Sequence, residues 1–183
     1  MLPRLSQSLF KSLRTWRGVL RMWVGAVCCI GTVFAPLAVA VSETPVLPLP
    51  RFASLRSEQV NMRAGPGLRY PVDWVYMRRF LPVEVVSEYE SWRKVRDPDG
   101  AEGWVHRSML SARRTGIIRA SKAMLRRTAD GGASPAAWLR EGVVVRVHQC
   151  PQASPFCRVE VDSIHGWVLK REVWGVYKEE ELG

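Results

Sequence analysis

Val60-Asn61-Met62-Arg63 ends forty positions before Gly103-Trp104-Val105, and the same arrangement returns at Ala123-Met124-Leu125-Arg126 and Gly166-Trp167-Val168 with identical spacing. The second pair of segments follows the first after about sixty-three residues. Internal similarity at a fixed period indicates repeated copies of one structural unit. These segments therefore predict two tandem units of the same fold rather than one larger domain.

Each unit contains the same series of short segments with the pattern of β-strands. After the opening strand comes a loop with glycine, at residues 64–67 in the first unit and 130–132 in the second. Alternating or apolar runs follow, and each series leads through a turn to the Gly-Trp-Val strand. These runs are residues 82–86 and 92–96 in the first unit, and 143–147 and 157–161 in the second. We predict five short strands in each unit.

The predicted fold is all-β, with two small barrels in tandem. A unit of about sixty residues with five short strands buries one face and protects its edges most simply by closing on itself. Apolar side chains at alternate positions are expected to fill the first barrel: Val83, Val85, Val95 and either Trp104 or Val105. No segment between residues 57 and 178 has a long helical period, although residues 133–140 are long enough for one or two helical turns.

The repeat also sets the expected domain boundaries. We place the first five-stranded barrel at residues 57–115 and the second at residues 116–178. A barrel of this size is marginally stable alone, so the two are expected to support each other across the short connection at residues 113–119. Residues 41–56 contain three prolines and predict an extended, semi-rigid linker, and residues 179–183 form an acidic tail.

The first forty residues have the features of a helical export signal. Residues 1–21 are basic and polar, residues 22–35 are uncharged and mostly apolar, and Ala38-Val39-Ala40 supplies small residues at the spacing of a cleavage site. We expect cleavage after Ala40 and a periplasmic location. The competing hypothesis is an uncleaved membrane anchor, because apolar character continues to residue 41, but Pro36 favours a break before the cleavage site.

The positive charge of the chain does not indicate nucleic-acid binding. The formal net charge is +10, but five of the 27 basic residues lie in the export segment, which has no acidic residue. The other 22 basic residues are interspersed with 17 acidic ones instead of forming a basic stripe. We therefore expect no nucleic-acid partner, and membrane contact only through an uncleaved leader.

Two cysteines, Cys150 and Cys157, lie after the export segment. A pair of cysteines in an exported chain predicts a disulfide, worth about 2.5 kcal/mol for so short a loop. The competing hypothesis is a zinc site in which these cysteines join His148 and His165. The Cys-x6-Cys spacing and an oxidising compartment disfavour it, so we predict no metal site and no cofactor.

At this point the sequence resembles the bacterial Src-homology-3-like (SH3-like) domains of exported cell-envelope proteins. In the first unit, the resemblance rests on residues 60–67 (Val-Asn-Met-Arg-Ala-Gly-Pro-Gly), 70–72 (Tyr-Pro-Val), 92–96 (Trp-Arg-Lys-Val-Arg) and 103–106 (Gly-Trp-Val-His). The second unit is less similar, because it lacks the Gly-Pro-Gly loop and has Pro-Phe-Cys near the position of Trp92. The resemblance implies a recognition module for peptidoglycan, its stem peptides or another envelope protein, and it implies no reaction.

Five side chains of the first unit are candidates for ligand binding. Four aromatic residues surround the predicted long loop and the adjoining strand, where apolar contact and a polar group can hold a peptide or glycan. A fifth residue, Arg63, ends the opening strand and suits a carboxylate. The aromatic candidates are Tyr70, Trp74, Tyr76 and Trp92. The competing role is structural: core packing for the aromatic residues and a local ion pair for Arg63.

These observations favour a non-catalytic periplasmic module that binds or scaffolds, with peptidoglycan or an envelope protein as its partner. The alternative is a structural adaptor that docks on one envelope protein and binds no small ligand. A zinc-dependent or thiol-dependent enzyme is the third hypothesis and requires Cys150 and Cys157 as free thiols. The sequence has no Gly-x-Ser-x-Gly elbow and no His-Glu-x-x-His pair.

Overall fold

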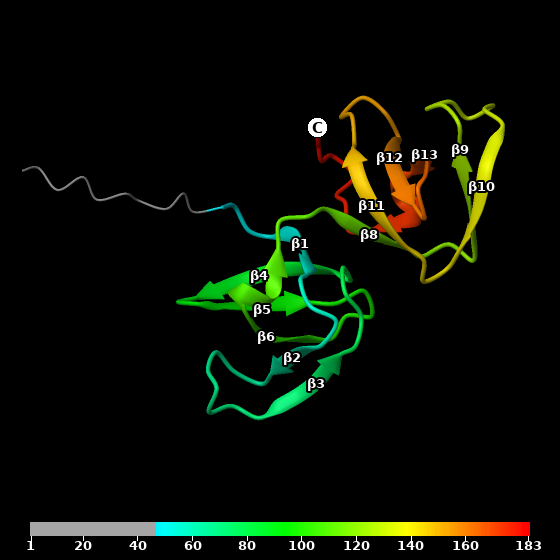
Figure 1. Ribbon diagram of the computed structural model, residues 1–183. Coiled ribbons are helices and arrows are strands. Elements are labelled where there is room, and N and C mark those ends of the chain that lie inside the picture. Colours follow the sequence, from blue (N-terminus) through cyan, green and yellow to red (C-terminus); the bar gives the residue numbers. More distant parts are fainter. Residues whose placement is uncertain (1–46) are drawn as a thin grey trace, which may run out of the picture. The chain divides into compact units, whose positions relative to one another are not determined.

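The computed structural model describes residues 47–183, so the predicted export segment and the first residues of the predicted linker lie outside the described residues. The described chain forms two seven-stranded antiparallel sheets (Figure 1). A 3-10 helix of three residues precedes the last strand of each sheet. None of the helices in this described part is long and apolar enough to cross a membrane. The predicted all-β architecture is confirmed.

The first module contains seven strands where the sequence predicted five. Its elements are β1 (Arg51–Leu55), β2 (Val60–Arg63), β3 (Val72–Tyr76), β4 (Pro82–Tyr89), β5 (Trp92–Arg96), β6 (Glu102–His106), the 3-10 helix η1 (Arg107–Met109) and β7 (Leu110–Ser111). The strands pair in the order β3-β2-β6-β5-β4-β1-β7. The segments named from the sequence correspond to β2, β4, β5 and β6, so β1, β3 and β7 were not located, and β1 and β7 pair with each other at one end of this order.

The second module repeats this arrangement strand for strand. Its elements are β8 (Thr115–Ile118), β9 (Lys122–Arg126), β10 (Pro135–Arg140), β11 (Val144–Gln149), β12 (Phe156–Val161), β13 (Ile164–Leu169), the 3-10 helix η2 (Lys170–Glu172) and β14 (Val173–Trp174). The strands pair in the order β10-β9-β13-β12-β11-β8-β14, which is the order of the first module shifted by seven. The sequence repeat is therefore a repeat of the fold.

Each sheet curls around its own apolar core. In the first module, the two strands at opposite ends of the sheet order, β3 and β7, supply Tyr76 and Leu110 to one cluster of buried side chains. Because both ends of the sheet touch the same cluster, the sheet wraps around it like a small barrel. Val105 is fully buried in this core, whereas Trp104, which the sequence offered as the alternative, is only half-buried on the other face.

The glycine of each Gly-Trp-Val strand is needed because a neighbouring strand passes very close. A Cβ atom at Gly103 would lie 2.4 Å from Cγ of Met62 on β2. At Gly166 it would lie 2.6 Å from Cγ of Leu125 and 2.7 Å from the carbonyl oxygen of Arg126 on β9. A larger residue at either position would force these neighbours to move, which explains why the glycine occurs in both modules.

Two expectations for local structure were wrong. Residues 51–55 of the predicted linker form β1, which pairs with both β4 and β7 and buries Ser54 and Leu55 completely. Residues 133–140, which had room for helical turns, instead form β10 from Pro135 onward, paired with β9. In both places the pairing partner, which is distant in sequence, decides the conformation of a short segment with little pattern of its own.

An aromatic cluster joins the two modules. Phe52 on β1 packs against Trp174 on β14, with ring centroids 5.0 Å apart in an edge-to-face arrangement. Tyr177, just beyond β14, packs on the same phenylalanine at 4.6 Å. Aromatic pairs at these separations stabilise an interface beyond the area that they bury. The first strand of one module is therefore held by the last residues of the other.

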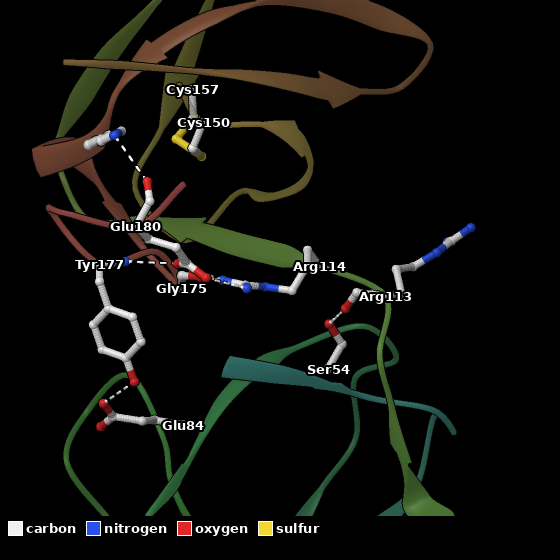
Figure 2. A network of polar contacts seen from close by, with 10 residues as sticks. Ser54, Glu84, Arg113, Arg114, Cys150, Cys157, Gly175, Tyr177 and Glu180 are labelled. Carbon is white, nitrogen blue, oxygen red and sulfur yellow. Dashed lines mark hydrogen bonds and ion pairs between the residues drawn. A yellow bond between two sulfur atoms is a disulfide. The ribbon is translucent and has the colours of Figure 1, made fainter. Parts of the chain in front are cut away.

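Hydrogen bonds also join the two modules, and Figure 2 shows those of Tyr177, Ser54 and Arg114. The Tyr177 hydroxyl donates to Oε1 of Glu84 on β4 at 2.8 Å. Oγ of Ser54 lies 2.6 Å from Oγ1 of Thr115 on β8, and both residues are buried. Arg114, next to Thr115, pairs with Glu180 beyond β14. The expected mutual support of the two modules thus has a structural basis in specific side chains.

Candidate ligand-binding groove

A groove of about 830 Å³ opens on the first module between β2, β5 and η1. It lies where β2 faces the end of β6, the Gly-Trp-Val strand. Six of its lining residues carry the chemistry: Asn61, Arg63, Ser91, Trp92, His106 and Ser108. The groove therefore combines an aromatic wall with several groups that donate or accept hydrogen bonds, which is the composition of a ligand site.

Trp92 and His106 form the inner end of the groove. They are direct partners in the β5–β6 ladder, and their rings meet edge to face with centroids 5.4 Å apart. Only 8% of the Trp92 surface is exposed, so its ring is mainly part of the packing and only a small part of it reaches the groove. The sequence placed Trp92 both as a candidate ligand contact and as a core residue, and the structure allows it to serve both purposes.

The orientation of the His106 ring follows from the cap that it makes on η1. The backbone N–H of Ser108 donates to Nδ1 of His106 at 3.3 Å, and Oγ of Ser108 lies 2.7 Å from the same nitrogen. Because Nδ1 accepts a hydrogen bond from the backbone N–H of Ser108, the neutral ring carries its hydrogen on Nε2. His106 therefore has an Nε2–H donor that the cap does not use.

Arg63 lines the groove but uses its charged end on the neighbouring loop. Its Nη1 donates to the carbonyl oxygens of Leu68 and Tyr70, at 3.3 and 2.7 Å. These two bonds hold the loop between β2 and β3 in place. The local structural role considered for Arg63 is therefore present, with carbonyl oxygens as partners instead of a carboxylate.

Tyr70 also belongs to that loop. A Cβ atom at Gly65 would lie 2.5 Å from the Tyr70 ring, so the Gly-Pro-Gly segment is shaped to let the ring lie flat on its backbone. The guanidinium of Arg69 also lies over the ring, 5.2 Å from its centroid. Tyr70 therefore packs the loop that borders the groove, and its role in ligand binding stays a prediction.

The two remaining aromatic candidates lie away from the groove. Tyr76 is buried in the core, where its hydroxyl hydrogen-bonds to Asp97 at 3.3 Å. Burial and the neighbouring Asp97 carboxylate raise the pKa of Tyr76. Trp74 lies on β3 and is 58% exposed. Of the five predicted contacts, Arg63 and Trp92 line the groove, Tyr70 borders it, and Trp74 and Tyr76 are elsewhere.

Sequence reasoning missed Asn61, His106 and Ser108. Asn61 is exposed on β2 between the buried Val60 and Met62, so strand alternation placed it on the outer face but gave no reason to choose it. His106 and Ser108 belong to the turn after the Gly-Trp-Val strand. The signal available was a histidine followed two residues later by serine, which permits a capping contact but carries no ligand information by itself.

The predicted disulfide joins Cys150 and Cys157. Both cysteines are completely buried at the base of the hairpin between β11 and β12. Because both sulfurs are bonded, neither is a thiolate, and the zinc site and thiol enzyme that required free cysteines are excluded in this form of the protein.

The comparisons with known proteins agree with the repeat. A family model described as bacterial SH3 domain matches residues 56–112 and again residues 119–175. The comparison with curated proteins gave no match. Among solved structures, the chain is similar to NlpC2 from Trichomonas vaginalis at 11% identity and a TM-score of 0.32, over 74% of this chain and 52% of that one. For NlpC1 from the same organism the values are 12% and 0.32, over 75% and 50%. The chain thus spans about half the length of these two proteins, and a likeness this weak carries no inference about function.

Proposed function

The chain belongs to the bacterial SH3 domain family, in two tandem copies, and from this premise we propose that it is a non-catalytic binding protein of the bacterial cell envelope. Bacterial SH3 domains commonly bind peptidoglycan. We place the binding site in the groove of the first module and the protein in the periplasm, to which the predicted export segment would direct it.

The observation that carries this proposal is the set of groups that the groove presents. The His106 ring offers an Nε2–H donor, Asn61 offers an amide that both donates and accepts, and Ser108 offers a hydroxyl. The Trp92 ring and the side chain of Met109 supply apolar surface beside them. Such a mixture suits a short peptide with amide, carboxylate and methyl groups in close succession.

Within peptidoglycan, we propose that the stem peptide is the ligand rather than the glycan strand. Sugar rings bind best on an exposed aromatic face, but Trp92 is only 8% exposed. The polar groups of the groove instead match the hydrogen-bonding pattern of peptide bonds. Because Nη1 of Arg63 is occupied by the loop carbonyls, a carboxylate of the ligand would find its donors at His106 and at the remaining N–H groups of Arg63.

No bond-making step is assigned to the contact between Ser108 and His106. Nδ1 of His106 accepts the backbone N–H of Ser108 as well as facing its hydroxyl, which is the arrangement of a helix cap. A nucleophile would need a base that is free to take its proton.

The second candidate function is a structural adaptor, and the exposed apolar side chains of β3 favour it. This strand lies at the end of the sheet order, and three of its apolar side chains are at least 39% exposed: Val72, Trp74 and Val75. Leu68 and Met77, which flank the strand, are still more exposed. An exposed apolar edge strand is a surface on which another protein can add a strand.

Sedimentation with purified peptidoglycan separates the two functions. The test variant carries Asn61→Met and His106→Leu, the residues that the second module has at the equivalent positions, Met124 and Leu169. Because that module folds with these residues, the change should leave the fold intact. We expect the affinity for peptidoglycan to fall at least about tenfold, which corresponds to about 1.4 kcal/mol.

Trp74→Ala is the matched control, since it removes apolar surface from β3 and leaves the groove unchanged. The proposal predicts wild-type sedimentation for this control. If the wild-type protein stays in the supernatant and Trp74→Ala abolishes crosslinking to one envelope protein in cells, the adaptor function is correct instead. Equal sedimentation of the wild type and the groove variant would mean that the groove is not the site.

A further inference from the structure

Three side chains with metal-binding atoms converge on the outer face of the second module. His148, Glu160 and His165 come from the adjacent strands β11, β12 and β13. Glu160 and His165 are direct partners in the β12–β13 ladder. His148 lies where the register of β11 shifts against β12, between Val147 and Gln149. A bulge of this kind redirects a side chain, and here it turns the imidazole toward the glutamate.

One ligand atom from each of these residues lies within 4.8 Å of the other two. Nε2 of His148 is 2.7 Å from Oε2 of Glu160, and the two histidine rings are 5.8 Å apart between centroids. Ligand atoms around a tetrahedral zinc ion are about 3.3 Å apart, because the bonds are about 2.0 to 2.1 Å long. Small rotations of these side chains would therefore bring all three onto one ion.

We propose that His148, Glu160 and His165 form a binding site for a divalent transition-metal ion such as Zn²⁺. Two imidazoles and a carboxylate are ligands that zinc accepts. The three residues lie at the protein surface, with side-chain exposures of 33% for His148 and 27% for Glu160. The fourth position of a tetrahedral ion would face solvent and hold water. This site differs from the cysteine-containing site considered from the sequence and is independent of the groove in the first module.

The local structure holds the three residues in place before any ion binds. The disulfide between Cys150 and Cys157 closes the hairpin that carries His148 and Glu160. Asp162 and Ser163, both with positive φ, form the tight turn between Glu160 and His165. Two positive φ values in a two-residue hairpin loop fix the register of the flanking strands. The cost of assembling the site is therefore small.

The charges around the site act in opposite directions. Oε2 of Glu160, which lies 2.7 Å from Nε2 of His148, supplies negative charge that attracts a cation. Nη1 of Arg146 lies 3.9 Å from the same oxygen, Oε2, and competes with a metal ion for it. Removing this guanidinium should strengthen metal binding.

The first module shows what the same position looks like without metal ligands. Arg96 and Glu102, the equivalents of Glu160 and His165, form an ion pair at 2.7 Å. Glu84, the equivalent of Arg146, pairs with Arg96 at 3.1 Å. The bulged residue is Val86 instead of histidine. Ion pairs close this face in the first module, whereas in the second module two imidazoles share a single carboxylate.

Calorimetric titration of the purified protein with Zn²⁺, without a histidine tag, tests the site. We expect one zinc ion per chain. His148→Ala and His165→Ala should each lower the affinity at least about 100-fold, because loss of a ligand costs more than loss of a residue that only orients one. Arg146→Gln should raise the affinity about five- to tenfold by removing a nearby positive charge.

Glu102→Gln, at the place in the first module equivalent to His165, is the matched control and should leave zinc binding unchanged. Circular dichroism of each variant shows whether the fold is kept, and His165 is exposed enough that its replacement leaves the core untouched. Absence of saturable zinc binding, or zinc affinity that neither histidine substitution changes, would overturn the proposal. Peptidoglycan binding by the His148→Ala variant should equal that of the wild type, so the two proposals can fail separately.

Discussion

The two modules have the same sheet topology and differ in the side chains that they carry on it. Strand order, the Gly-Trp-Val strand, the bulge in the fourth strand and the 3-10 helix before the last strand recur in both. The groove of the first module contains Asn61 and His106, whereas the second has Met124 and Leu169 at these positions. The fold therefore tolerates either polar or apolar residues there, and the choice of residue decides whether a polar ligand can be bound.

The equivalent arginines show the same divergence. Arg63 uses Nη1 to hold the loop after β2 through two carbonyl oxygens. Arg126 instead lies over the ring of Phe156, 5.3 Å from its centroid, and donates to the carbonyl oxygen of Met124. Phe156 replaces Trp92 in the ladder, opposite Leu169 in place of His106. This part of the second module is an apolar surface covered by an arginine and serves packing.

The largest predicted effect breaks the shared motif itself. Gly166→Ala should destabilise the protein by about 3 kcal/mol, because its Cβ would meet a backbone carbonyl oxygen at 2.7 Å. Gly103→Ala should cost only about 1.5 kcal/mol, because its closest contact is the flexible side chain of Met62 and the backbone oxygen is 3.0 Å away. Urea unfolding followed by tryptophan fluorescence measures both values. Equal costs, or the reverse order, would contradict this difference between the modules.

The disulfide exists in the second module alone, so its removal should lower the stability of that module more than that of the first. The double substitution Cys150→Ser and Cys157→Ser should lower the free energy of unfolding of that module by about 2.5 kcal/mol, since the unfolded chain gains the entropy of an open loop. Chemical denaturation with a probe in each module measures it. The first module has no cysteine and should lose stability only through the shared interface. A larger loss in the first module than in the second would be inconsistent with this view.

The bond from Tyr177 to Glu84 tests how strongly the modules support each other. Tyr177→Phe keeps the aromatic contact with Phe52 and removes the hydroxyl, so it should cost about 1.5 kcal/mol as the loss of a hydrogen bond to a charged, mostly buried acceptor. We expect the unfolding transitions of the two modules to separate in denaturant. A single transition at the wild-type midpoint would show that this bond does not couple them.

The smallest predicted effect concerns acid. Burial opposes ionisation of Glu180, but hydrogen bonds from Arg114 and from the backbone of Tyr177 outweigh it and lower the pKa of this carboxyl. A lowered pKa means that Glu180 stabilises the folded state above its ordinary value near 4.5 and that this contribution disappears as the pH falls below it. Glu180→Gln should remove about 1 kcal/mol at neutral pH, because the Arg114–Glu180 pair is only partly exposed to solvent.

Glu179→Gln is the control for that experiment, because Glu179 is 81% exposed and its nearest partner, Lys178, is 3.8 Å away. Thermal unfolding between pH 3 and pH 7 should show a weaker pH dependence for Glu180→Gln and an unchanged one for the control. The same pH dependence of thermal unfolding in both variants would contradict the role assigned to Glu180.

Much of the fold could be predicted because the repeat fixes it. The alternation of buried and exposed residues and the two Gly-Trp-Val strands identified the strands that recur with recognisable sequence. The first strands of the modules escaped because Arg51–Leu55 and Thr115–Ile118 share no residue pattern, although they occupy the same place in the two sheets. Their conformation comes from pairing with β4 and β11, which no local pattern records.

The candidate sites were harder to predict for the same reason. Aromatic residues were visible in the sequence, but their partners decide their roles: Tyr76 lies in the core beside Asp97, and Trp74 lies outside. Asn61 and His106 meet only because β2 and β6 are neighbours in the sheet. Likewise, His148 and His165 were considered as metal ligands from the sequence, but Glu160 joins them only through the pairing of three strands.

Titration of a soluble peptidoglycan stem peptide into isotopically labelled protein, followed by NMR chemical shifts, tests the central claim most directly. The account predicts that the indole N–H of Trp92 and the side-chain amide of Asn61 shift with a common saturation curve, while the signals of Met124 and Phe156 stay in place. Shifts concentrated in the second module, or no shifts at millimolar peptide, would contradict the assignment of binding to the first module.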